Sequence, residues 1–152
     1  MQQIWWKYTK TVSAMLYFAL IIYITFLARR RLGDTDYRAN ANLILFDKFV
    51  SAQDYFKMPA KARQGYIQDV LGNVLMFMPF IPALEWVLRK NIKTVYAVLL
   101  IFAGSALIEI LQYVLNRGVF DVDDILLNVL GGLTGLLLVR IFCNHKKLMN
   151  QS

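Results

Sequence analysis

The sequence predicts an all-α, polytopic membrane protein with four transmembrane helices, and three observations lead to this fold class. Hydrophobic residues make up 58% of the 152 residues, whereas a soluble domain contains about half. Charged residues, 18% of the chain, gather between long apolar blocks. Those blocks approach the length of about 20 residues that a helix needs to cross the hydrocarbon core. We expect one domain over residues 1–152, because no repeat or low-complexity tract divides the chain.

The first and third helices are the most clearly marked in the sequence. We expect the first over residues 11–28, where the apolar run is long and leads into three arginines at 29–31 without a small-residue cleavage site. This pattern favours a retained helix over a secretory signal. We expect the third over residues 94–115, although it carries Glu109 and Gln112.

The apolar runs that mark the second and fourth helices are shorter than those of the first and third. Residues 70–84 contain Pro79 and Pro82, and proline removes a backbone hydrogen bond, so a helix there is kinked near the first proline. Basic residues at the helix ends can extend the span toward the headgroups. We therefore expect helices over residues 70–88 and 122–142. The alternative is three helices, with residues 70–84 forming a re-entrant segment.

The linker between the first two helices, residues 29–69, is the longest polar stretch. Within it, the segment NLILFDKFVSAQDYF (42–56) mixes bulky apolar residues with charges. That mixture is typical of a segment that lies on the membrane surface. With four spans, this linker and the loop at residues 116–121 share one membrane face, and the two termini share the other.

The polar residues of the predicted spans lie near one membrane face. A helix rises about 1.5 Å per residue, which places Asn73, Glu109 and Asn128 within about 6 to 9 Å of the face shared by the linker. The acidic block GVFDVDDILLNVLGG (118–132) begins at that face. An ionisable residue inside a membrane helix is costly and marks a candidate functional site.

Helical periodicity places these polar residues on inward stripes. Glu109 and Gln112 share a face of the third helix, and Asp124 and Asn128 share a face of the fourth. Gly131 and Gly135 continue the fourth-helix stripe, in a spacing that lets another helix pack closely. The predicted functional cluster comprises Asn73, Glu109, Gln112, Arg117, Asp121, Asp123, Asp124 and Asn128.

The three aspartates permit two readings. In the first, Asp121 or Asp123 caps the fourth helix, and all three complement its N-terminal dipole. In the second, their mutual repulsion is relieved by Arg117 nearby or by a cation, with a divalent metal at Asp121, Asp123 and Asp124 as the cofactor. For Glu109 we expect a partner on another helix, either Asn73 or Asn128. Arg38 is the alternative charged partner.

The net charge of +7 does not indicate nucleic-acid binding, because the basic residues flank apolar segments and suit lipid headgroups. The sequence contains no Walker loop, GxSxG or HExxH motif. It assigns no catalytic residue and leaves enzymatic activity open.

Three motifs resemble the VanZ-like family of small polytopic membrane proteins. They are NVLMFMPF (73–80), IEILQ (108–112) and the block from Arg117 through DVDDILLNVLGGLTG, which ends at residue 135. NLILF (42–46) is a weaker match, since the family usually has proline where Leu45 stands. The resemblance implies a relation to resistance against glycopeptides of the teicoplanin type, which act on cell-wall precursors at the outer surface. It also implies that the eight clustered positions carry the function.

Two function hypotheses follow. In the first, the cluster binds, and in one version modifies, a lipid or cell-wall-precursor headgroup, so the partners are membrane lipids and a lipid-linked or phosphorylated headgroup. In the second, the protein is a non-enzymatic accessory or small transporter component, and the cluster is structural. In both cases we expect a multi-pass protein of the cell membrane with cytoplasmic N- and C-termini.

Overall fold

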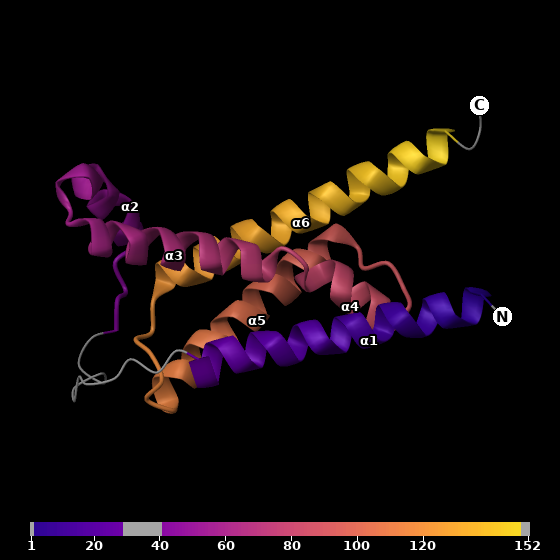
Figure 1. The fold of residues 1–152 in the computed structure, drawn as a ribbon, viewed down its shortest axis with the longest axis horizontal. Coiled ribbons are helices and arrows are strands. Elements are labelled where there is room, and N and C mark those ends of the chain that lie inside the picture. The colour runs from indigo at the N-terminus through magenta and orange to yellow at the C-terminus, as the bar shows by residue number, and fades with distance from the viewer. Residues whose placement is uncertain (1, 29–40, 150–152) are drawn as a thin grey trace.

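The computed structural model describes residues 2–28 and 41–149, and these residues are helical apart from loops and one isolated β-bridge (Figure 1). Four helical stretches are long and apolar enough to cross a membrane, which confirms the predicted fold class. The elements are α1 (Gln2–Ile22) with a π-helical end, η1 (Tyr23–Ala28); α2 (Asp47–Ser51) with a 3-10 turn, η3 (Ala52–Lys57); α3 (Ala60–Phe77); α4 (Phe80–Leu88); α5 (Thr94–Val114); and α6 (Val122–Met149).

The second span is α3 and α4 together, with a bend of 24° between them. Pro79 and Pro82 lie at the bend, where they cannot donate backbone hydrogen bonds. The carbonyl oxygen of Met76 there accepts a hydrogen bond from the Tyr17 hydroxyl of α1 (2.7 Å). The helix begins at Ala60, earlier than the predicted start at residue 70, because apolar content marks the membrane-embedded part and not the helix end.

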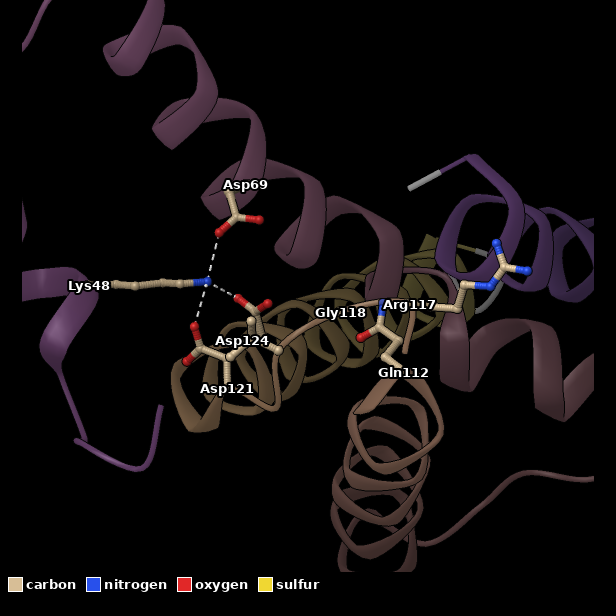
Figure 2. Close-up of a pocket in the computed structure, with 8 residues that line it drawn as sticks. Lys48, Asp69, Gln112, Arg117, Gly118, Asp121 and Asp124 are labelled. Atoms are coloured by element: carbon tan, nitrogen blue, oxygen red, sulfur yellow. Dashed lines mark hydrogen bonds and ion pairs between the residues drawn. The ribbon is translucent and has the colours of Figure 1, made fainter. Parts of the chain in front are cut away.

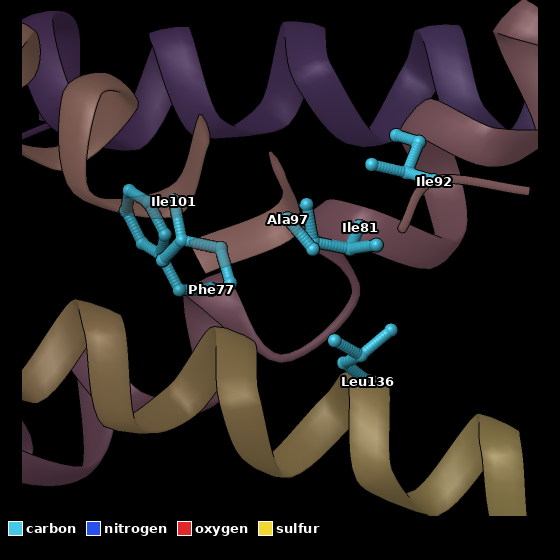
Figure 3. Packing of buried hydrophobic residues seen from close by; sticks show 6 residues of the cluster. All are labelled: Phe77, Ile81, Ile92, Ala97, Ile101 and Leu136. Atoms are coloured by element: carbon cyan, nitrogen blue, oxygen red, sulfur yellow. The ribbon is translucent and has the colours of Figure 1, made fainter. Parts of the chain in front are cut away.

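The helix α6 is the centre of the bundle. It packs along α3 and α5 and also contacts α4, while α1 lies against α4 (Figure 1). The buried apolar cluster fills the space between these helices toward the middle of the molecule (Figure 3). Its members are Phe77, Ile81, Ile92, Ala97, Ile101 and Leu136.

Two glycines of α6 lie against the backbone of the second span. A Cβ atom at Gly131 would overlap the carbonyl oxygen of Val74, and one at Gly135 would overlap that of Met78. The backbones therefore touch at the bend, in an approach that small residues permit between membrane helices.

Candidate functional site

The described part of the linker begins beside the start of α6 (Figure 1). The backbone N–H of Asn42 donates to the carbonyl of Phe120 (2.8 Å), and that of Val122 donates to the carbonyl of Asn42 (3.2 Å). These bonds form a parallel bridge between Asn42 and Asp121. The linker is thus fastened to the start of α6.

Asp123 holds the linker a second time. Its two carboxylate oxygens accept hydrogen bonds from the backbone N–H groups of Phe46 (2.7 Å) and Lys48 (2.8 Å). The side chain is fully buried, and a carboxylate strengthens each such bond. Asp123 therefore sets the position of α2 with respect to α6.

Asp121 is the N-cap of α6. Its Oδ1 accepts from the backbone N–H of Asp123 (2.9 Å), as a capping aspartate does. Its own backbone N–H donates to Oε2 of Glu109, which lies buried on α5 (3.2 Å). Asp121 therefore caps α6 through its side chain and contacts the buried Glu109 through its backbone.

The Lys48 side chain reaches a group of carboxylates (Figure 2). Its Nζ lies 2.7 Å from Asp69 and 3.2 Å from Asp121, and it also donates to Asp124. Asp124 accepts a further hydrogen bond from Nδ2 of Asn73 (2.6 Å).

These contacts fix the charge state of the Lys48 ammonium. Burial alone would lower the pKa of Lys48, but the neighbouring carboxylates of Asp124 and Asp69 outweigh burial and raise this pKa above its usual range. Lys48 is therefore charged at neutral pH.

A pocket of about 250 Å³ adjoins this ammonium. On its far side the Arg117 guanidinium points away from the carboxylates, and the residue is exposed (Figure 2). The residues that line the pocket are Lys48, Asp69, Gln112, Arg117, Gly118, Val119, Asp121 and Asp124.

The end of α5 sets the place of Arg117. Asn116 adopts a left-handed conformation (φ 54°), and the backbone N–H groups of Arg117 and Gly118 turn back to the carbonyl of Gln112 (2.7 and 3.3 Å). This is a helix termination that a left-handed residue makes possible. It brings Arg117 and Gln112 to the same pocket.

A second polar layer lies deeper in the bundle. Nδ2 of Asn128 donates to Oγ of Ser105 (2.9 Å), and Nε2 of Gln112 donates to the carbonyl of Thr25 (3.4 Å). Oδ1 of Asn128 and Oγ1 of Thr25 have no hydrogen-bond partner within residues 2–28 and 41–149. This layer joins α6 and η1 to α5.

The predicted cluster divides into three places in the structure. Four members line the pocket: Gln112, Arg117, Asp121 and Asp124. Asn73 contacts the pocket through Asp124, and Asp123 faces the linker instead. Glu109 and Asn128 lie beneath, both buried.

Two of the partners expected for Glu109, Asn73 and Asn128, make hydrogen bonds to other side chains. The amide nitrogen of Asn73 donates to Asp124, and that of Asn128 donates to Ser105. Arg38, the alternative partner, lies outside the described residues.

The three aspartates predicted as metal ligands do not converge on one point. Asp123 is turned to the linker backbone, and the Lys48 ammonium lies beside Asp121 and Asp124. Within the part of the chain that the structure describes, no three His, Cys, Asp or Glu side chains are arranged to hold a metal ion. The geometry is that of carboxylates around an ammonium group.

Sequence reasoning missed Lys48 and Asp69. A signal for Lys48 was present, because it is the only cation in the segment 42–56 and that segment shares a face with the acidic loop. Asp69 carried no such signal, since it ends a polar stretch and lies 21 residues from Lys48 in the sequence.

Fold and site together define a class: a small polytopic helical membrane protein with a charged pocket at one end of its bundle. The chain belongs to the VanZ/LLP1 family, whose sequence model matches residues 14–143. It is 30% identical over 92 residues to Protein VanZ of Enterococcus faecium. That match covers 57% of this chain and 52% of VanZ, so the chain spans about half the length of this relative. No solved structure matches the chain.

Proposed function

We propose that the pocket binds the headgroup of a membrane lipid or of a lipid-linked cell-wall precursor. The observation that carries this proposal is a single pocket that combines an exposed guanidinium, Arg117, with a carboxylate-bound ammonium, Lys48. Guanidinium groups suit phosphate, which they bind with two parallel hydrogen bonds. A volume of about 250 Å³ suits a headgroup and not a whole lipid.

The surroundings of the pocket support a ligand with acyl chains. In the linker, Leu43 and Ile44 are each 68% exposed, close in sequence to Lys48. At the end of α5, Val114 and Leu115 are also exposed, close in sequence to Arg117. A lipid that placed its headgroup in the pocket could keep its chains on this apolar surface.

We also propose cytoplasmic termini, which place the pocket on the outer face. The loop before α5 and the C-terminal tail are short and purely basic, whereas the linker carries acidic residues too. The family's relation to antibiotics that act outside the cell favours the same orientation. A cysteine at position 118, in a Cys143→Ser background, should react with an impermeant thiol reagent in whole cells. Reaction only after lysis would reverse the orientation.

Lipid-dependent stabilisation tests the binding proposal. Short-chain phospholipids should raise the thermal unfolding midpoint of the detergent-solubilised protein, and Arg117→Ala should abolish that rise. Lys61→Ala is the matched control, because Lys61 is an exposed cation outside the pocket. No rise in the wild type, or equal loss in both variants, would contradict the proposal.

A second candidate is a non-enzymatic accessory or small transporter component, in which the charged residues only hold the bundle together. The observation in its favour is that Asp121, Asp123 and Asp124 all bind groups of the protein itself. In that case Glu109→Gln and Asp124→Asn should lower the amount of protein in detergent as much as they lower its cellular activity. Normal amounts with lost activity would favour the headgroup site.

A further inference from the structure

Another cavity lies beside the loop between α4 and α5, toward the end of the bundle where α1 begins and α6 ends (Figure 1). It has a volume of about 360 Å³ and is formed by the end of α4, the loop and the first turns of α5. We call it the loop groove, and its lining residues are Leu88, Lys90, Ile92, Tyr96, Leu99 and Leu100. It shares no lining residue with the pocket around Lys48.

Polar and apolar groups follow one another along the loop groove. Lys90 belongs to the loop, and Tyr96 to the first turn of α5. Leu99 and Leu100 lie about 7 to 9 Å further along α5 from its first residue, and they are 59% and 40% exposed. Lysine and tyrosine suit the membrane interface, whereas leucine suits the hydrocarbon. A phospholipid has the same order of groups, with the phosphate outermost and the acyl chains beneath it.

The charges at this end of the bundle favour an anionic ligand. The helix α1 contains no acidic residue, and residues 70–108 and 125–152 contain only Glu85. The Glu85 carboxylate already pairs with Arg140 of α6. Lys90 is exposed and forms no ion pair within the part of the chain that the structure describes. A phosphate group at Lys90 would therefore meet a cation whose charge no described carboxylate neutralises.

We propose that the loop groove binds an anionic phospholipid, with its phosphate beside Lys90 and an acyl chain along Leu99 and Leu100. Basic pockets between membrane helices suit the headgroups of such lipids. The Tyr96 hydroxyl is placed to donate a hydrogen bond to an oxygen of the headgroup. With cytoplasmic termini, the lipid belongs to the inner leaflet. This site is separate from the headgroup site around Arg117 and does not depend on it.

The loop has a fixed conformation, so the groove exists before the lipid binds. The backbone N–H of Ile92 donates to Glu85 (2.8 Å), and the Ile92 carbonyl accepts from Arg140 (3.0 Å). Arg89 ends α4 in a left-handed conformation (φ 55°). Ile92 is buried and also lines the groove, and it thereby connects the fixed loop to the apolar wall. A preformed site loses less conformational entropy when it binds a ligand.

Native mass spectrometry of the full-length protein in detergent tests the proposal, with dioleoyl phosphatidylglycerol and dioleoyl phosphatidylcholine as probes. The measurements use Arg117→Ala, so that the headgroup pocket does not contribute. We expect the glycerol lipid, which is anionic, to bind about fivefold more tightly, the effect of one lysine near an anionic lipid. Long chains are required because the groove wall is apolar, whereas the short-chain lipids that test the Arg117 pocket cover less of this wall. Equal affinity for the two lipids would overturn the proposal.

Two lysines of the loop separate a site from a generally basic surface. Lys90→Gln should remove the preference for the anionic lipid. Lys93→Gln is the matched control, because Lys93 is exposed in the same loop but does not line the groove, and it should keep the preference. Both substitutions remove one positive charge from the same end of the bundle. An equal loss in both variants would mean that the net charge attracts the lipid, and it would overturn the site.

A substitution in the apolar wall tests the place of the acyl chain. Leu99→Trp fills part of the groove and should weaken binding of both lipids at least about threefold, because it displaces apolar chain contacts. Leu107→Trp is the matched control, since Leu107 is 55% exposed on the same helix outside the groove. Unchanged affinity in Leu99→Trp would contradict the proposal. A dimer in the same spectra that Leu99→Trp dissociates would indicate a second copy of the chain in the groove, and it would also overturn the lipid site.

Discussion

The two ends of the helical bundle use the same chemical groups in different ways. At the end opposite the pocket, buried Glu85 of α4 pairs with Arg140 of α6. The backbone of Ile92, in the loop before α5, completes the arrangement. Its N–H donates to Glu85 (2.8 Å) and its carbonyl accepts from Arg140 (3.0 Å). One carboxylate, one guanidinium and one peptide unit satisfy one another.

The described residues of the pocket end are arranged differently. Three carboxylates share the Lys48 ammonium, Arg117 stands apart from them, and a cavity remains between these groups. The comparison teaches that burial of charge does not by itself indicate function in this protein. The Glu85–Arg140 pair has the form of a structural clasp, whereas Lys48 and its carboxylates border a cavity.

The largest effect is expected in the middle of the bundle, where a substitution should destabilise the fold and so disrupt the arrangements at both ends. In Gly135→Ala the added Cβ overlaps the carbonyl oxygen of Met78, a backbone atom that cannot rotate away. We expect a destabilisation of about 3 kcal/mol or more, at the upper end of overpacking effects. Size-exclusion chromatography in detergent should show little monodisperse protein. Gly72→Ala is the matched control, because nothing lies within 4 Å of that position, and it should be neutral or slightly stabilising.

The next largest effect is expected at the clasp. Glu85→Gln leaves the Arg140 guanidinium without its counter-charge, and loss of one partner of a buried pair costs about 3–5 kcal/mol. We expect the lower end of this range, because the Arg140 side chain is 33% exposed. Thermal unfolding should show the loss, while lipid affinity at the pocket stays unchanged. A variant of normal stability with altered lipid affinity would reverse the roles assigned to the two ends.

A smaller and local effect is expected at Asp123. Asp123→Ala removes the acceptor for the N–H groups of Phe46 and Lys48, at about 1–3 kcal/mol for each buried donor left unsatisfied. Hydrogen exchange of these two amides should accelerate, while that of α5 and of the apolar part of α6 should not. Uniform acceleration over the whole bundle would mean that Asp123 supports the fold as a whole and not the linker.

The spans were predictable because their signal is local. A long apolar run predicts a membrane helix from composition alone, and Pro79 and Pro82 predicted the bend. The start of α3 at Ala60 was not predictable in this way, because its first turns are polar and the chain changes environment without a change in backbone conformation.

The partners inside the site were less predictable because they depend on how the helices pack. The residues of the acidic block were found from helical spacing, but their contacts were not. Lys48 reaches Asp69 and Asp124 from a linker that Asp123 holds against α6. These contacts join segments far apart in the chain, and helical periodicity does not predict them.

The smallest effect on stability is expected for Arg117, the pocket residue that sharpens the comparison most. Its backbone N–H makes the hydrogen bond to Gln112 that ends α5, and this bond survives any side-chain substitution. The guanidinium is exposed and points away from the carboxylates (Figure 2), so Arg117→Ala should change the free energy of unfolding by no more than about 0.5 kcal/mol. Thermal unfolding of Arg117→Ala and Glu85→Gln, measured side by side, compares the loss of stability at the two ends. A loss in Arg117→Ala as large as that in Glu85→Gln would make Arg117 part of a second clasp and remove the cation on which the headgroup site depends.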